Sequence, residues 1–251
     1  MKHSLLYITL FNVFLLGCVK SIAFEEKMAL TNLYDNKSLG SSAHDLLSDE
    51  KYNSLKVEIH YMRGFMPKKE ALAELRKFLN KYLNKPNGIY IITKEIDAVP
   101  DIELSLNEVH LIEKAKRTVF TTQNQIAIYV LFTNGYLKDN AMLGWAYKNT
   151  SAVIFGKKIK ENSGAIGQPS RTKLEASVLM HEMSHLLGLV NIGSPTQKIY
   201  KEGNHGKHCN NKECLMYYRT EVKDQYKFIM KLKMPALDED CEADLKANGG
   251  K

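Results

Sequence analysis

The stretch from His181 to Gly188 most constrains the fold of this chain, because it places two histidines and a glutamate on one predicted helix. Residues 171–187 contain neither proline nor glycine, and apolar residues recur among them at helical spacing. His181 and His185 are four residues apart, so both imidazoles project from one face and can reach the same metal ion. Glu182 lies beside the first histidine, where its carboxylate can take a proton from a water molecule on that ion. The pattern therefore predicts a zinc site on a mostly buried helix.

The ends of this helix are also marked in the sequence. Thr172 and Glu175 have the spacing of a capping box at its start. Gly188 follows the last apolar residues and supplies the left-handed conformation that commonly ends a helix. Burying two histidines and a glutamate for packing alone would be costly, which disfavours a purely structural helix.

A catalytic zinc site needs a third protein ligand and one open position. Asn191, three residues after Gly188, is a poor zinc ligand. The next histidines along the chain are His205 and His208, and both are candidates for the third ligand.

The residues after these histidines resemble those of a known family. His208 and Cys209 form a pair, Cys214 follows after four further residues, and Met216 follows after one more. Archaemetzincins, a family of zinc peptidases, carry the same order and spacing after their helix motif. The chain is also similar to the matrixin-like zinc-protease lipoproteins of Bacteroides-type bacteria. It departs from the archaemetzincin pattern by an insertion, residues 190–207, before the His-Cys pair.

The resemblance is specific over residues 172–218, and it implies roles for several side chains. His208 would be the third zinc ligand, with His205 in the insertion as its rival. Met216 would form the Met-turn beneath the metal. Tyr218 would donate a hydrogen bond to the oxyanion, as a tyrosine does in astacin-type relatives, although a packed aromatic is an equally good interpretation.

The resemblance also implies the fold class. We expect an α/β (α+β) metzincin-like domain, in which a mixed, twisted sheet of about five strands lies above the active-site helix. The cleft would lie between the upper and lower parts of the domain.

The later cysteines leave two alternatives open. Archaemetzincins use their cysteines, including a later Cys-x-x-Cys pair, for a second structural zinc. In this chain that pair is reduced to Asp238 and Cys241, so a zinc site there would need an aspartate ligand. A disulfide among Cys209, Cys214 and Cys241 suits an oxidising compartment, and we favour it, although the sequence does not fix the pairing.

The amino terminus predicts export and lipidation. Residues 1–17 have a basic start and an apolar run typical of a signal peptide, too short to span a bilayer comfortably. The run ends in Leu-Leu-Gly before Cys18, which resembles a bacterial lipobox. We therefore expect Cys18 to carry acyl chains that anchor the protein to a membrane of the bacterial cell envelope. Residues 18–52, polar in large part, would form a flexible tether, and residues 53–251 the catalytic domain.

Composition excludes few classes of protein. The chain is 44% hydrophobic and 25% charged, as expected for a globular domain that can bury a core. The net charge of +7 comes from scattered lysines without a nucleic-acid motif, so we expect no nucleic-acid partner. We expect a monomer whose partner is a protein or peptide substrate.

The remaining chain shows strand and helix patterns in alternation. Apolar residues predict strands near residues 57–61, 89–93, 126–132, 143–147 and 151–155. The first two flank a helix that opens at Pro67, which predicts a parallel strand-helix-strand unit. Further helices are expected at residues 102–119, 222–233 and 237–248. By the resemblance, residues 143–147 would be the edge strand along which an extended substrate lies, although a strand in the core of the sheet is an equally good interpretation.

Taken together, these patterns predict zinc-dependent hydrolysis of peptide bonds. Zn²⁺ on His181, His185 and His208 would activate a water molecule, and Glu182 would carry its proton to the leaving amine. Two alternatives remain: a catalytically silent lipoprotein that binds a partner, and an amidase that acts on peptidoglycan peptides.

Overall fold

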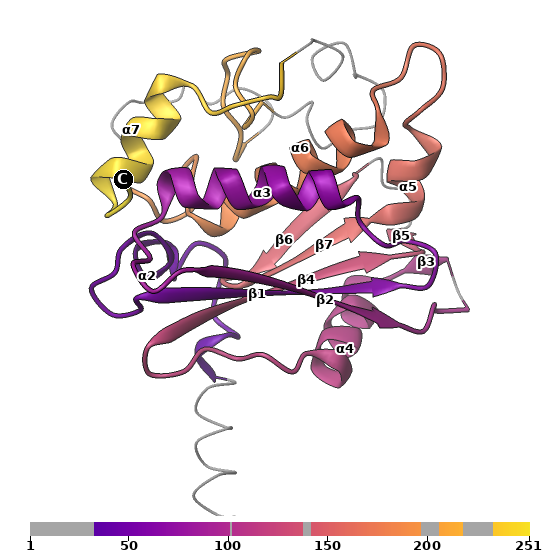
Figure 1. Ribbon diagram of the computed structural model, residues 1–251, viewed down its shortest axis with the longest axis horizontal. Helices are drawn as coiled ribbons and strands as arrows, with labels where there is room; N and C mark the ends of the chain where they lie inside the picture. Colours follow the sequence, from indigo (N-terminus) through magenta and orange to yellow (C-terminus); the bar gives the residue numbers. More distant parts are fainter. Residues whose placement is uncertain (1–32, 101, 138–141, 197–205, 218–232) are drawn as a thin grey trace, which may run out of the picture. The chain divides into compact units, whose positions relative to one another are not determined.

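The structure, a computed structural model (Figure 1), describes five stretches of the chain: residues 33–100, 102–137, 142–196, 206–217 and 233–251. Residues 35–251 form one compact unit, and residues 1–34 fall outside it. Within the described stretches, no helix combines the length and the apolar character needed to cross a membrane.

A five-stranded mixed sheet forms the centre of this unit. Its strands, in spatial order, are β2 (Ile89–Ile96), β1 (Ser54–Met62), β4 (Gln125–Thr133), β7 (Ser151–Phe155) and β6 (Gly144–Lys148). The first four are parallel to their neighbours, and β6 pairs with β7 in the antiparallel sense. The expected mixed sheet of about five strands is therefore present, and β6 lies at its edge as predicted.

Burial explains the order of the strands. All residues of β4 after Gln125 are buried, as expected for a central strand covered on both faces. At one edge, β2 exposes most of its side chains between Ile89 and Ile96. The predicted unit of β1, a helix and β2 is confirmed, because the two strands are parallel with Leu55 opposite Ile89.

Two long helices lie on one face of the sheet and a third lies on the other (Figure 1). The first pair consists of α3 (Lys69–Tyr82) and α6 (Arg171–Leu186), which pack against each other. The third is α4 (Leu106–Lys116), whose Val109 joins the apolar core on its own side of the sheet. The shorter helices are α2 (Ala43–Leu47), α5 (Gly156–Glu161) and α7 (Glu239–Ala247).

Helix α4 is shorter than expected from residues 102–119. It begins after Ser105, whose hydroxyl and the Glu108 carboxylate form a reciprocal capping box. The two residues before this cap form β3 (Glu103–Leu104), which pairs with β5 (Tyr136–Leu137). Helix α7 confirms the helix expected at residues 237–248. Most of the helix expected at residues 222–233 lies outside the described stretches.

The segment from Asp35 to Tyr52 is packed into the unit, which corrects the expected tether over residues 18–52. Leu46 and Leu47 of α2 are fully buried. The Asp35 carboxylate pairs with the buried guanidinium of Arg117 at 3.2 Å. The polar composition of this segment reflects buried hydrogen bonds and ion pairs, not chain disorder. The domain therefore begins about twenty residues earlier than position 53, and residues 18–32 lie outside the described stretches.

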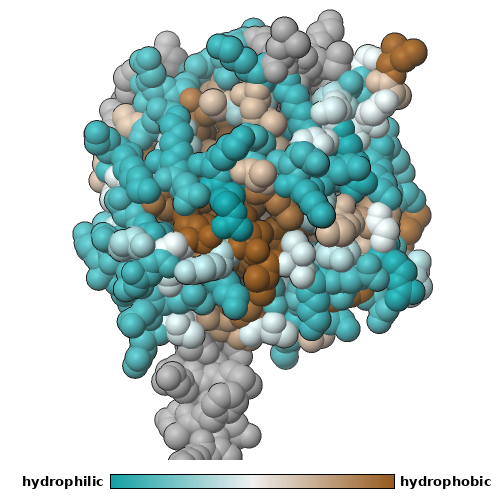
Figure 2. Space-filling model, viewed as in Figure 1, coloured by the Kyte–Doolittle hydropathy of each residue, from teal (hydrophilic) through white to brown (hydrophobic). Residues whose placement is uncertain are grey.

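Most of the surface in Figure 2 is hydrophilic, and a hydrophobic patch lies near its middle. The patch lies where Figure 1 shows β1 and β2. Tyr90 and Ile92 of the edge strand β2 are 52% and 40% exposed.

Candidate metal centre

Helix α6 carries the central motif, and its ends are set by local contacts. Its N-cap is Ser170, whose hydroxyl accepts a hydrogen bond from the Lys173 amide. The predicted capping box of Thr172 and Glu175 is therefore wrong. The Glu175 carboxylate instead accepts hydrogen bonds from the Lys68 amide at 2.7 Å and the Arg171 guanidinium at 2.6 Å, which ties α6 to the start of α3.

Gly188 ends the helix as predicted. Its φ is +80°, and its amide donates to the carbonyl of His185. A Cβ at this position would come within 2.5 Å of the Ser194 amide nitrogen, so the turn has no space for a side chain. The motif therefore stops one turn after His185, where the chain leaves the helix.

Three histidines converge at the surface of α6. The Nε2 atoms of His181 and His185 are 3.2 Å apart. His208, from the segment 206–217, places its ring centroid 5.3 Å from each of the other two. One ligand nitrogen from each histidine lies within 4.8 Å of the other two. Nitrogens bound to one tetrahedral zinc ion are about 3.4 Å apart, so the group fits a metal ion with modest adjustment.

A backbone contact orients the first histidine. The Nδ1 atom of His181 lies 2.9 Å from the carbonyl oxygen of Leu215, which can only accept a hydrogen bond. Nδ1 must therefore carry the proton in the neutral ring, which leaves the lone pair of Nε2 directed at the group. This arrangement of a ligand histidine held by a carbonyl is typical of metal sites.

The three histidines differ in their exposure. His181 is fully buried and His185 is 6% exposed, whereas His208 is partly exposed. Three protein ligands match the number that catalytic zinc sites use, with the remaining position left for water or substrate. The donor set therefore fits a catalytic site better than a closed structural one.

Glu182 points from α6 towards the edge strand β6. A Cβ on Gly144, the first residue of β6, would lie 2.8 Å from Oε1 of Glu182 and 2.9 Å from Cγ1 of Val178. Only a glycine gives the carboxylate this space beside the strand. This role of Gly144 was not predicted, although a glycine inside a strand pattern was the signal that could have shown it.

Several predicted site residues lie outside the described stretches, namely Cys18, His205 and Tyr218. Of the two candidates for the third ligand, the structure brings His208 into the group. Met216 is fully buried in the same segment, and its carbonyl accepts a hydrogen bond from the Cys209 amide at 2.8 Å.

A second group of possible ligands lies next to the first in the sequence. Cys209, Cys214, Asp238 and Cys241 each place one ligand atom within 4.8 Å of the other three. The Cys214 and Cys241 sulfurs are 3.7 Å apart, and the three buried cysteines form no disulfide with one another. The expected disulfide is therefore absent from this group. Because a disulfide joins only two sulfurs, it would not account for the approach of the third thiol and the carboxylate.

The chemistry of this second group suits a thiophilic metal. Hydrogen bonds from the Cys214 and Cys241 thiols lower the pKa of Cys209, which favours a thiolate there. The Asp238 Oδ2 atom lies 3.3 Å from the Cys209 sulfur. Thiolate ligands favour zinc over harder divalent ions such as magnesium and calcium.

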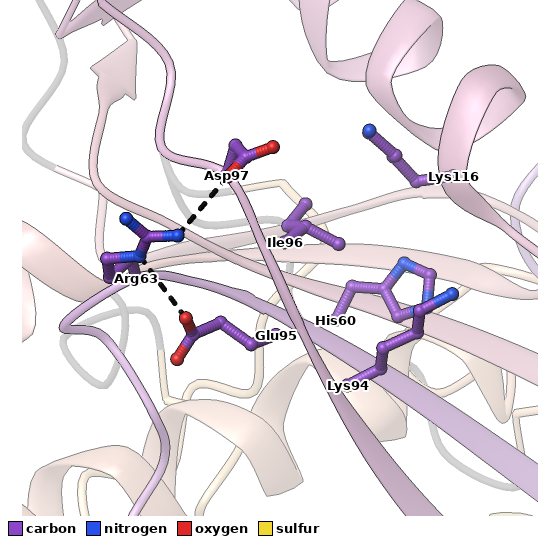
Figure 3. A pocket seen from close by; sticks show the side chains of 7 residues that line it. All are labelled: His60, Arg63, Lys94, Glu95, Ile96, Asp97 and Lys116. Atoms are coloured by element: carbon purple, nitrogen blue, oxygen red, sulfur yellow. Dashed lines mark hydrogen bonds and ion pairs between the residues drawn. The ribbon is translucent and has the colours of Figure 1, made fainter.

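A surface pocket of about 210 Å³ lies away from both groups (Figure 3). It is lined by His60, Arg63, Lys94, Glu95, Ile96, Asp97 and Lys116. The Arg63 guanidinium bridges the Glu95 and Asp97 carboxylates at 3.3 and 3.5 Å. His60 precedes Met62 by two residues on β1 and so faces the α4 side of the sheet. None of the predicted ligands lines this pocket, so it is not the candidate metal centre.

No protein-family model matches the chain, and no curated protein matches its sequence. Among solved structures, the archaemetzincin from Methanopyrus kandleri is similar, with a TM-score of 0.52 and 12% identity over 78% of this chain and 96% of that one. Metalloproteinase-II from Bacteroides fragilis gives a TM-score of 0.46 and 12% identity over 90% of this chain and 70% of that one. At this identity, the likeness to the archaemetzincin establishes the α/β fold alone.

Proposed function

We propose that this protein is a zinc metallopeptidase that hydrolyses peptide bonds in proteins or peptides. The observation that carries the proposal is the convergence of His181, His185 and His208, with their ligand atoms within 4.8 Å of one another. Glu182 extends from the same helix beside the edge strand. The similar structure from Methanopyrus kandleri is that of an archaemetzincin, the family whose motif this sequence resembles, which agrees with this chemistry.

Each side chain has a defined task in the proposed reaction. When bound, the zinc ion supplies a Lewis acid that makes water a nucleophile near neutral pH and polarises the scissile carbonyl. His181, held by the Leu215 carbonyl, keeps its Nε2 lone pair for the metal. Glu182 takes the proton from the attacking water and delivers it to the leaving amine. Tyr218 would donate a hydrogen bond to the oxyanion.

Strand β6 supports the proposal that the substrate is an extended peptide. Among the described residues it pairs with β7 alone, and it lies at the edge of the sheet. A peptide added along this edge would gain main-chain hydrogen bonds, and pockets for alternate side chains would select its sequence. Gly144, at the start of β6, would bring the scissile bond close to Glu182.

We further propose that Cys18 is lipidated and holds the enzyme on a membrane of the bacterial cell envelope. The support is the apolar run before Cys18 and the Leu-Leu-Gly-Cys sequence in which it ends. In cells, Cys18→Ser should move the protein from the detergent phase to the aqueous phase of a phase-partition assay. A variant that stays in the detergent phase would contradict lipidation at this residue.

The proposed activity is tested with Glu182→Gln. The variant should retain zinc on its three histidines and lose casein hydrolysis by a factor of about 10² to 10⁴, the usual contribution of a general base. Glu161→Gln, which changes an exposed glutamate at the end of α5, is the matched control and should retain wild-type activity. Wild-type protein that binds zinc and cleaves no unstructured protein would indicate a binding lipoprotein. Cleavage of purified cell-wall peptides but not casein would indicate an amidase.

A further inference from the structure

The pocket shown in Figure 3 has no part in the proposed peptidase chemistry, because none of the predicted metal ligands lines it. Its volume of about 210 Å³ is larger than the roughly 30 Å³ that one water molecule occupies in the liquid, so a small ligand fits inside. The lining consists of three cationic side chains, two carboxylates, His60 and Ile96. The way in which these groups are paired indicates the kind of ligand.

The two carboxylates of the pocket are already paired. Glu95 and Asp97 lie 3.3 and 3.5 Å from the Arg63 guanidinium, so each faces a positive charge. They would therefore repel an incoming anion less than unpaired carboxylates would. A metal cation, by contrast, would have to compete with Arg63 for both of them.

Two lysines at the pocket carry positive charges that are not paired. Lys94 of β2 lies opposite His60 of β1 in the parallel register, so both side chains project from the same face of the sheet. Lys116 is the last residue of α4, the helix on that face. Within the described stretches, neither ammonium group forms an ion pair. Two such groups at one cavity supply donors for an anion and no acceptor for a cation.

His60 adds a buried ring to the wall of the pocket. Its side chain is fully buried, and in the view of Figure 3 the ring lies between the side chains of Lys94 and Lys116. Nε2 of the ring lies 3.1 Å from Oε1 of Glu58. Burial would raise the pKa of Glu58, but its polar contacts lower it to about 2, so this carboxylate is ionised near neutral pH. An ionised carboxylate repels a lone pair on Nε2, so the hydrogen of the neutral ring is on Nε2 and the lone pair is on Nδ1.

The Nδ1 atom of His60 is left without a donor. It is buried and has no hydrogen-bond partner in the part of the chain that the structure describes. A buried acceptor that receives no hydrogen bond is unfavourable. A ligand that brings a hydroxyl group into the pocket would satisfy this nitrogen, whereas an oxygen that carries only lone pairs would be repelled by it.

We propose that this pocket binds a small oxyanion that bears a hydroxyl group, and that monohydrogen phosphate is the ion that fits. Lys94 and Lys116 donate to the charged oxygens, and the P–OH group donates to Nδ1 of His60. Sulfate has the same charge and no hydrogen, and a phosphate ester loses its last P–OH hydrogen at about pH 6. The pocket should therefore select free phosphate over sulfate and over the phosphate group of an ester.

Titration calorimetry of the purified protein tests this selectivity with inorganic phosphate, sulfate and glycerol phosphate. Slightly alkaline conditions keep imidazoles neutral and the ester without its P–OH hydrogen. Sulfate and the ester should bind about 10-fold more weakly than phosphate, because they leave Nδ1 of His60 unpaired. In nitrogen NMR spectra of isotope-labelled protein, phosphate should move the Nδ1 resonance of His60, which a purely structural histidine would not show.

Substitution of the lysines tests where phosphate binds. Lys94→Gln and Lys116→Gln should each weaken phosphate binding about 3- to 10-fold, since each removes one charge-assisted hydrogen bond at an exposed position. Lys114→Gln is the matched control, because it changes another exposed lysine of α4 that does not line the pocket, and it should bind phosphate as the wild type does. Circular dichroism checks that each variant is folded.

Two results would overturn the proposal. One is equal affinity of the wild type for phosphate and sulfate. The other is unchanged phosphate affinity in both Lys94→Gln and Lys116→Gln, which would place the anion elsewhere, for example on a metal ion at the histidine group. Because every readout is anion binding, the outcome does not depend on whether the protein cleaves peptides.

Discussion

At the scale of single residues, the histidine group is defined as much by its neighbours as by its ligands. The Leu215 carbonyl selects the tautomer of His181, and Gly144 leaves the space into which Glu182 extends. Neither residue has a side chain that takes part in chemistry. Their effect is positional: one holds a lone pair and the other a carboxylate in the orientation that the proposed reaction needs.

Gly144→Ala tests the positional role of this glycine. The added methyl group would lie 2.8 Å from Oε1 of Glu182, so the carboxylate must move. Displacing a catalytic group by about 1 Å can lower the rate by about 100-fold, and we expect a loss of that order in kcat/KM. Zinc content should not change, because the nearest neighbours of the new methyl group are Glu182 and Val178, not the histidines. A folded variant with wild-type kcat/KM would show that Glu182 needs no fixed position beside β6.

At the scale of secondary structure, long apolar patterns in the sequence predicted the helices and strands well. Polar contacts that set the ends of these elements could not be predicted from the sequence. The run Ile126–Phe132 could be identified as a central strand, because such a run has few alternatives. The start of α6 was misplaced by two residues, because Glu175 bonds to Lys68, a partner more than one hundred positions away. Helix α2 was missed because two leucines in a short polar segment produce no periodic signal.

The candidate site shows the same division between local and distant contacts. The spacing of His181 and His185 on one helix was enough to predict that their imidazoles lie close together and can reach the same metal ion. The spacing of Cys209 and Cys214 could not distinguish a disulfide from a four-ligand group, because the decision depends on Asp238 and Cys241 from another segment. The sequence therefore drew attention to these four residues, but it favoured a disulfide over the group that the structure brings together.

Glu58 ties the loop after α4 to strand β1, and its titration predicts a pH dependence of stability. Burial alone would raise the pKa of Glu58, but the His60 ring, 3.1 Å from its carboxylate, and hydrogen bonds from Thr118 and the Val119 amide lower it to about 2 from an ordinary value of 4.5. A lowered pKa in the folded state means that the ionised carboxylate stabilises the fold fully above about pH 4.5. That stabilisation is lost as the pH falls towards 2.

Urea unfolding in the presence of a chelator measures this contribution. The free energy of unfolding of the wild type should fall as the pH is lowered from 4.5 to 2, and Glu58→Gln should show a flatter dependence over the same window. Glu70→Gln, which changes an exposed glutamate of α3, should follow the wild type. Parallel curves for wild type and Glu58→Gln would mean that the carboxylate interacts equally in the folded and unfolded states.

At the scale of the whole molecule, the unit depends on a segment that its composition would assign to a linker. Residues 35–52 join parts of the sequence that are far apart. Asp35 pairs with Arg117 and accepts a hydrogen bond from the Thr121 amide at 2.8 Å. The Lys85 ammonium donates to the carbonyl of Tyr52 at 2.7 Å. The segment thus supplies ion-pair and hydrogen-bond partners to residues in other parts of the unit.

Two shortened chains should therefore behave differently. A chain that begins at Asp35 retains every contact named above, and we expect it to unfold cooperatively. A chain that begins at Asn53 loses two buried leucines, each contributing about 1.5–3 kcal/mol, and removes one of the two buried carboxylates that pair with Arg117, leaving Glu113. The combined loss approaches the total stability of a typical domain, about 5–15 kcal/mol. Thermal unfolding followed by circular dichroism distinguishes the two chains, and a cooperative transition for the chain from Asn53 would show that residues 35–52 only cover the domain without stabilising it.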